Sequence, residues 1–381
     1  MIPYGRQTIE QDDIDAVVTS LKSDFLTQGP RVEEFETALA QYGGAAHAVV
    51  FANGTLALMA AYSAAGLSAG HSFVTTPLTF AATSSAGVWL GASPLFCDVS
   101  PQDGNLTLEA LNQLSNAASA KLLVSVDFAG KPVDYDALRE WCAQRKMLFI
   151  SDACHALGAS YKGKKVGGLA DMTVFSFHPV KSITTGEGGA VLTNNKDLAD
   201  KLRQFRHHGI KRTPDYYEVV SLGTNGRLTD FQSALGLSQL RKLDRFMELR
   251  RQWAQRYSEL LSDAADFALP MEVPACESAW HLYQVRLTNP ALIPQRWSIV
   301  RRLREAGIGA QVHYEMVSHQ PYFVQNFRNA TPCPNAEHFS AAAISLPIYP
   351  TLKAEEVAEV CTVLKRVVKE TLELVRPRAN V

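Results

Sequence analysis

The chain has 381 residues, more than one ordinary domain core holds, so two domains are expected. Its 46% hydrophobic and 20% charged residues are typical of a globular protein, and the net charge of −1 excludes a bulk attraction to nucleic acid or to an anionic membrane. The six cysteines form no CxxC pair, and no apolar run suits a signal peptide or a membrane span, so we expect a cytoplasmic protein with no metal, membrane or nucleic-acid partner.

In chain order, short β-branched runs alternate with helical patterns from about residue 46 to residue 193. Strands are expected at 47–51, 73–77, 94–98, 122–127, 148–152, 172–177 and 190–193. Helices are expected at 55–66, 80–90, 107–115 and 134–145. This alternation predicts a mostly parallel sheet with helices on both faces. Because such sheets bind ligands beyond the carboxyl ends of their strands, candidate functional residues are sought there.

The rest of the chain predicts a second, smaller unit. Helical patterns at 195–208 and 229–262 precede a connection at 265–278 that contains proline and acidic residues. Strands are then expected at 282–287 and 310–314, and helices at 295–306, 335–343 and 353–374. We therefore expect an α/β protein in which residues 1–250 form a large domain around the seven-stranded sheet. Residues 251–381 are expected to form a smaller C-terminal α/β domain.

An acid and a lysine follow neighbouring strands of the expected sheet. Asp152 ends an apolar strand, and Lys181 lies in the turn after the strand at 172–177. A lysine amine forms a Schiff base with the aldehyde of pyridoxal 5′-phosphate (PLP), and a carboxylate keeps the pyridine nitrogen of PLP protonated. The pair therefore indicates a PLP site. Taken singly, an aspartate such as Asp152 is more commonly a helix cap or a turn residue, and most lysines are solvated surface residues.

Small residues between the first strand and its helix suit the cofactor phosphate. Gly54, Thr55 and Leu56 lie where backbone N–H groups at a helix start, with the Thr55 hydroxyl, favour a dianion. Ser176, near the end of its strand, is a further candidate contact. A plain capped turn and an ordinary strand serine are the alternatives.

Two ring side chains are candidates for contact with the cofactor ring. Phe80 follows the strand ending at residue 77 and is placed to stack on a pyridine ring. His155, three residues after Asp152, is a candidate contact of the phenolic oxygen. A core aromatic residue and a buried histidine are the alternative interpretations.

Several motifs together resemble the fold-type-I PLP aminotransferases that act on nucleotide-linked keto sugars, the DegT/StrS family. The resemblance covers nearly the whole chain and rests on segments that are weak singly and specific together. They are Phe25–Pro30, Asn53–Thr55, Asp152–Gly158, Ser176–Lys181, Gly186–Gly189, Asn225–Asp230 and Gln311–Tyr314.

The resemblance implies roles for individual residues. Lys181 is implied to be the catalytic Schiff-base lysine. The implied cofactor-binding residues are Gly54, Thr55, Leu56, Phe80, Asp152, His155, Ser176 and Asn225. The implied substrate-binding residues are Tyr4, Leu26, Thr27, His178 and Tyr314. Because the residue matching Asn225 reaches the cofactor phosphate of the other subunit in this family, a homodimer with shared active sites is also implied.

A closer resemblance is to the family branch that acts in pseudaminic acid synthesis. It rests on residues 79–80, 125–127, 176–191, 233–240, 280–283 and 345–350. This branch transfers an amino group from L-glutamate to carbon 4 of a UDP-linked 4-keto-6-deoxy-N-acetylhexosamine. The alternatives are another nucleotide-linked keto-6-deoxy sugar, with dTDP or GDP, and a non-catalytic regulatory relative. Family members that dehydrate keto sugars carry histidine in place of the lysine, so the presence of Lys181 argues against a dehydratase.

The chain departs from the family pattern at two places. Gly226 stands where an aromatic residue is usual, in the loop implied to cross to the partner subunit. Glu315 and Met316 replace the usual Ile/Lys-Pro pair after Tyr314. The second departure falls in a segment implied to bind the sugar and so bears on the choice of substrate.

Overall fold

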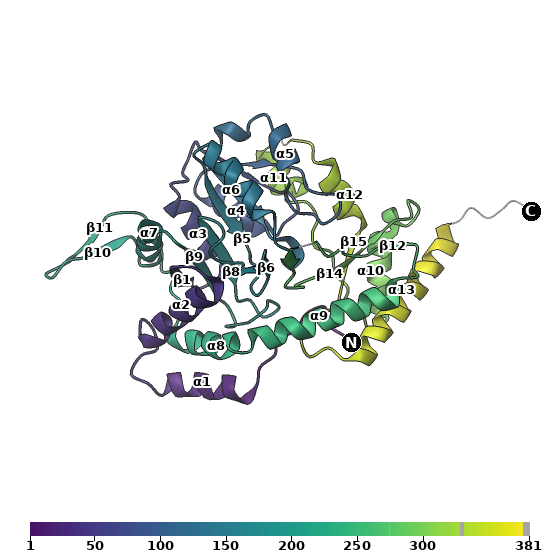
Figure 1. Ribbon diagram of the computed structural model, residues 1–381, viewed down its shortest axis with the longest axis horizontal. Coiled ribbons are helices and arrows are strands. Elements are labelled where there is room, and N and C mark those ends of the chain that lie inside the picture. Colours follow the sequence, from purple (N-terminus) through teal and green to yellow (C-terminus); the bar gives the residue numbers. More distant parts are fainter. Residues whose placement is uncertain (274, 328–330, 376–381) are drawn as a thin grey trace, which may run out of the picture.

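A computed structural model describes residues 1–273, 275–327 and 331–375 (Figure 1). Its largest element is a seven-stranded sheet of order β1-β9-β8-β5-β4-β2-β3. The strands are β1 (His47–Phe51), β2 (Ser72–Thr75), β3 (Ser93–Phe96), β4 (Leu122–Val126), β5 (Leu148–Asp152), β8 (Met172–Ser176) and β9 (Gly189–Thr193). Only β9 pairs antiparallel with its neighbours, β1 and β8. The predicted mostly parallel seven-stranded sheet is therefore confirmed.

Helices cover both faces of this sheet (Figure 1). They are α2 (Pro30–Gly43), α3 (Gly54–Ala64), α4 (Ala81–Trp89), α5 (Leu108–Gln113), α6 (Tyr135–Gln144), α7 (Lys196–Arg206) and α8 (Asp230–Leu240). Successive residues of a strand point to opposite faces, so each strand contributes to two cores. Leu123 of β4 packs in one core with Leu138 of α6, whereas Val124 packs in the other with Leu58 of α3.

A smaller antiparallel sheet, of order β12-β14-β15, lies in the C-terminal part of the chain. Its strands are β12 (Phe267–Ala268), β14 (Tyr283–Leu287) and β15 (Ala343–Leu346), and its core includes residues of α9 (Leu243–Leu261), α10 (Arg296–Glu305) and α13 (Ala354–Val375). The strand expected at 310–314 is wrong, because that segment makes a single bridge, between Gln311 and Ser345. Helix α9 runs continuously through residue 250, and the domain division at that residue stays a prediction.

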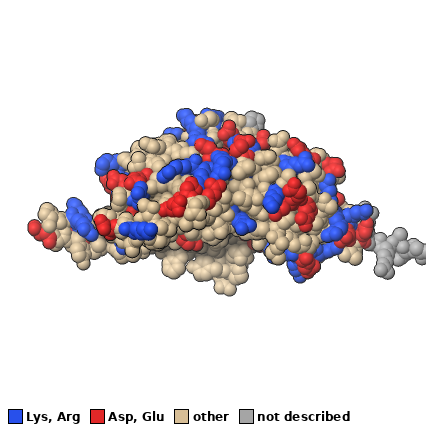
Figure 2. All heavy atoms as spheres, turned by 90° about the horizontal axis from the view of Figure 1, so that it is seen from below, with Lys and Arg blue, Asp and Glu red and all other residues tan. Residues whose placement is uncertain are grey.

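The remaining elements are short or peripheral. They are α1 (Gln11–Leu21), β6 (Ser160–Tyr161), β7 (Lys164–Lys165), β10 (Ile210–Arg212), β11 (Tyr217–Val219), β13 (Cys276–Glu277), α11 (Pro321–Asn326) and α12 (Pro334–Ala342), with short 3-10 turns at residues 117–119, 128–130, 293–295 and 317–319. The β10–β11 hairpin projects from the body beside α7 (Figure 1). Acidic and basic side chains intermingle over the face seen in Figure 2. Within the described ranges, no helix is long and apolar enough to cross a membrane.

Candidate active site

The sequence-predicted residues gather where the parallel strands end. Asp152 is the last residue of β5 and Ser176 is the last residue of β8, and these two strands are hydrogen-bonded neighbours. Gly54 begins α3 and faces Ser176 so closely that an added Cβ would lie 3.2 Å from the serine Oγ. A side chain at position 54 would therefore require Ser176 to shift by a few tenths of an ångström. The site thus combines a helix start with two strand ends, as the sequence predicts.

Two hydrogen bonds orient the buried carboxylate of Asp152. Thr83 donates its hydroxyl to Oδ2 at 2.6 Å, and the Cys154 backbone N–H donates to Oδ1 at 3.2 Å. The Thr83 hydroxyl also lies 2.7 Å from the hydroxyl of Thr79, so the carboxylate belongs to a small polar network. The sequence analysis missed Thr83, because its link to Asp152 spans 69 residues and leaves no local pattern.

Lys181 lies in the turn after β8, where its backbone N–H donates to the carbonyl of His178 at 2.9 Å. Burial lowers the pKa of the Lys181 amine, while the nearby Cys154 and Asp152 act in the opposite direction. Nζ lies 3.5 Å from Nε2 of His281. The lysine is therefore held inside the site with a reduced preference for its charged form.

Three ring side chains form a cluster beside Lys181. The rings of His155 and His281 lie 4.3 Å apart, and the Tyr314 hydroxyl lies 3.1 Å from Nε2 of His155. Burial lowers the pKa of both histidines well below the usual value, with the charge of Lys181 acting in the same direction. Both rings are therefore neutral at pH 7. His281 lies within the motif at 280–283, which the sequence analysis used only for the resemblance.

The site fits PLP in its donor set and its shape. The buried carboxylate of Asp152 suits a pyridinium nitrogen, and the tight approach of Gly54 to Ser176 forms a cradle at the start of α3. Asn53 caps that helix by accepting from the Leu56 N–H at 2.9 Å. Nδ1 of His155 is buried and has no hydrogen-bond partner among the described residues. These same ranges contain no group of three His, Cys, Asp or Glu residues suited to a metal ion.

The sequence profile of the DegT/DnrJ/EryC1/StrS aminotransferase family matches residues 7–365. The chain belongs to this family. It is 39% identical over 360 residues to the UDP-4-amino-4,6-dideoxy-N-acetyl-beta-L-altrosamine transaminase of Campylobacter jejuni, a match covering 93% of this chain and 94% of the relative.

Two solved structures resemble this aminotransferase closely. Helicobacter pylori PseC, an aminotransferase involved in the biosynthesis of pseudoaminic acid, has a TM-score of 0.92 and 37% identity, covering 97% of this chain and 99% of PseC. The putative sugar aminotransferase Spr1654 of Streptococcus pneumoniae, in its PMP-form, has a TM-score of 0.92 and 28% identity, covering 99% and 100% of the two chains. Spr1654 has also been solved in a PLP-form. Membership in this family implies that the present aminotransferase depends on PLP.

The other predicted site residues lie outside the cluster around Lys181 and Asp152. The Tyr4 ring lies 5.4 Å from the ring of His313, which precedes Tyr314. Leu26 and Thr27 are exposed and connect to the start of α8, where the Asp230 N–H donates to the Leu26 carbonyl at 3.0 Å and Thr27 bridges Thr229. In the described part of the chain, Leu26, Thr27, His178 and Asn225 make no hydrogen bond with the side chains of Asp152, Lys181 or Tyr314.

Two exposed groups flank the site. Phe80 lies immediately before α4 and is 60% exposed, and its ring lies 6.1 Å from the Tyr314 ring. Thr55, on the first turn of α3, is also exposed. The Phe80 ring therefore lies largely outside the protein core.

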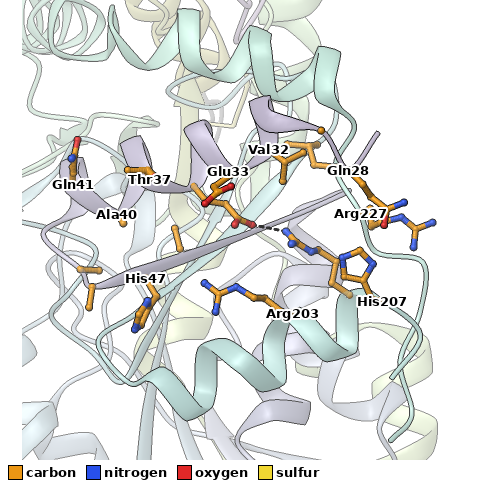
Figure 3. Close-up of a pocket in the computed structure, with 17 residues that line it drawn as sticks. Gln28, Val32, Glu33, Thr37, Ala40, Gln41, His47, Arg203, His207 and Arg227 are labelled. Carbon is orange, nitrogen blue, oxygen red and sulfur yellow. Dashed lines mark hydrogen bonds and ion pairs between the residues drawn. The ribbon is translucent and has the colours of Figure 1, made fainter. Parts of the chain in front are cut away.

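A separate cavity of about 580 Å³ lies along the edge strand β1, between α2 and α7 (Figure 3). Its lining includes the ion pair of Glu36 with Arg206, which also satisfies the outward N–H and carbonyl of Val50. No predicted site residue lines this cavity. Its polar groups bond the outward backbone groups of an edge strand.

Proposed function

We propose that this aminotransferase moves an amino group from L-glutamate to carbon 4 of a UDP-linked 4-keto-6-deoxy-N-acetylhexosamine, using PLP. The observation that carries the proposal is a lysine amine of lowered pKa, held beside a buried carboxylate and two neutral histidines. The 39% identity to transaminases of that name in Campylobacter jejuni and Helicobacter pylori supports the choice of substrate.

We assign the cofactor contacts to residues at the strand ends. Asp152 would meet the pyridine nitrogen and His155 the phenolic oxygen, while Phe80 would cover the ring. The start of α3, with Gly54, Thr55 and Leu56, and the Ser176 hydroxyl would hold the phosphate. Small residues at a helix N-terminus support this assignment, because unpaired backbone N–H groups and the helix dipole favour a dianion.

The proposed reaction needs a base that takes a proton from carbon and returns it. When bound, PLP supplies an aldehyde that condenses with amines and a ring that accepts the electron pair of a broken C–H bond. The neutral Lys181 Nζ takes the proton from the α-carbon of glutamate, and burial favours that neutral form. Asp152, oriented by Thr83 and the Cys154 N–H, holds the proton on the pyridine nitrogen. For the keto sugar, Lys181 moves the proton in the reverse direction.

Tyr4, Leu26, Thr27, His178 and Tyr314 are proposed to bind the sugar nucleotide. Tyr314 contacts His155 directly and Tyr4 approaches through His313, so these two would meet the part of the substrate nearest the cofactor. The exposed Leu26, Thr27 and His178 would meet its outer part.

We propose a homodimer in which Asn225 reaches the cofactor phosphate of the partner subunit. Asn225 is exposed and bridges His207, next to the projecting β10–β11 hairpin. That hairpin and the residues after it carry large exposed side chains, with Tyr217 66% and Leu222 92% exposed. An isolated two-stranded hairpin is only marginally stable in water, which supports its being covered by a second copy.

A spectrum of the protein with PLP, before and after borohydride reduction, tests the cofactor site. We expect a yellow adduct that maps to Lys181 after reduction, and that bleaches when L-glutamate is added to an unreduced sample. A label on another lysine, or no adduct, would refute the assignment of Lys181. Equal concentrations of UDP-, dTDP- and GDP-linked 4-keto sugars then compete for the aminated enzyme. Faster turnover of a dTDP or GDP sugar would replace the proposed substrate by that alternative.

A further inference from the structure

Lys181 has a side-chain neighbour that the sequence analysis did not assign. Nε2 of His281 lies 3.5 Å from Lys181 Nζ, and it is the only hydrogen-bond partner of that amine among the described residues. His281 comes from the segment before β14, 100 residues away in the chain. Its side chain is buried, and its ring lies against that of His155. The contact therefore links Lys181 to the segment that leads into β14 of the smaller sheet.

The backbone on both sides of His281 is anchored. The Ala279 N–H donates to the Gly130 carbonyl at 2.9 Å, and the Leu282 N–H donates to the Ala129 carbonyl at 3.2 Å. Gly130 has a φ of 96°, and a Cβ added there would lie 3.0 Å from the backbone nitrogen of His281. Only glycine allows this close approach of the turn after β4. The backbone of His281 is thus fixed by these contacts with residues 129 and 130, as the precise positioning of a side chain requires.

The groups around His281 define what it can do. Lys181, His155, Arg250 and His313 all act against a positive charge on its ring, in addition to burial. A neutral imidazole has one acceptor nitrogen, and an amine always has N–H groups to donate. Nε2 faces Lys181, so it accepts from Nζ–H in the tautomer that carries the ring proton on Nδ1, which is buried and has no hydrogen-bond partner among the described residues.

We propose that His281 is a positioning residue, which accepts a hydrogen bond from the free Lys181 amine and so directs it for proton transfer. The proposal rests on the proposed function for the reaction that Lys181 serves, but the contact itself is a property of the cofactor-free chain. No proton leaves Lys181 for His281 in this role. The histidine limits the amine to one orientation and thereby lowers the entropic cost of reaching the substrate carbon.

The first test measures the amine directly in cofactor-free, full-length protein. Trace acetylation with acetic anhydride across a pH series, read by mass spectrometry, gives the midpoint at which Lys181 becomes reactive. Because loss of an acceptor disfavours the ammonium form, we expect the midpoint to fall by about 1 pH unit in His281→Leu. His281→Gln, whose amide oxygen can accept, should stay near the wild-type midpoint. An unchanged midpoint in His281→Leu would overturn the proposal.

The second test uses the PLP-loaded enzyme. We expect kcat of the glutamate half-reaction to fall about 10-fold in His281→Leu with KM changed less than about 2-fold, and to recover largely in His281→Gln. His71→Leu is the matched control, because His71 is exposed and its side chain hydrogen-bonds, within the described part of the chain, with the Ser68 hydroxyl alone, at 3.1 Å. Equal losses in His281→Leu and His281→Gln would indicate a purely structural role and would also overturn the proposal.

The two proposals fail separately. If wild-type protein forms no adduct at Lys181, the proposed function is wrong, whereas the acetylation midpoint still decides the contact with His281. If His281→Leu does not fold, His281→Asn replaces it, because its shorter amide cannot reach Nζ. The same fall in midpoint is then expected, and an unchanged midpoint again contradicts the positioning role.

Discussion

Replacing Thr83 by valine is the sharpest test of how Asp152 is held. The change keeps the size of the side chain and removes the hydroxyl that donates to Oδ2 at 2.6 Å. Both residues are buried, so no water replaces the lost donor. A hydrogen bond to a charged group contributes about 1.5–3 kcal/mol. If all of that loss appears in the transition state, the glutamate half-reaction slows by roughly 10- to 150-fold, at about 1.4 kcal/mol per factor of ten.

The assay is single-turnover absorbance of the PLP-loaded enzyme mixed with L-glutamate, together with the Kd for PLP. Thr173→Val is the matched control, because Thr173 is also buried and its hydroxyl has no hydrogen-bond partner in the described part of the chain. We expect that control to react within about 2-fold of wild type, because the Thr173 hydroxyl makes no hydrogen bond that the substitution could break. A Thr83→Val enzyme with the wild-type rate and Kd would show that the threonine does not support the carboxylate.

Three further predictions follow from the same site. Lys181→Ala should still bind PLP but lose multiple turnover with glutamate and keto sugar, and sustained product release in a coupled assay would contradict its role. Burial lowers the pKa of His313 to about 4. The contribution of the neutral His313 ring to the free energy of unfolding is therefore complete above about pH 6.5 and is lost as the pH falls toward 4. By pH 5 the loss is about 2 kcal/mol, and urea unfolding of His313→Gln should show a correspondingly weaker acid dependence. Glu315→Gln breaks the ion pair with Arg296 next to Tyr314, and it should raise KM for the sugar several-fold without changing the glutamate half-reaction. Equal effects on both half-reactions would contradict a specific role of Glu315 in sugar binding.

The sequence alone determined the alternation of strands and helices and the residues at the strand ends. Asp152, Ser176 and Lys181 lie within one segment of 30 residues, so their placement follows from local periodicity and from the rule that parallel strands end at one edge. Gly54 and Thr55 follow from the same rule at the end of β1. The α/β fold class could be predicted because these signals are local and several of them agree, whereas the aminotransferase fold type was implied by the resemblance of the motifs.

The tertiary structure alone decided which distant side chains surround these residues. The contacts of Asp152 with Thr83, of His155 with Tyr314 and of Lys181 with His281 span 69, 159 and 100 residues, and no spacing in the sequence encodes them. The wrong strand at 310–314 has the same origin, because that segment is held by side chains and one bridge and lacks a ladder. Local pattern follows from the chain's own backbone geometry, whereas these contacts arise only when separately formed elements pack together.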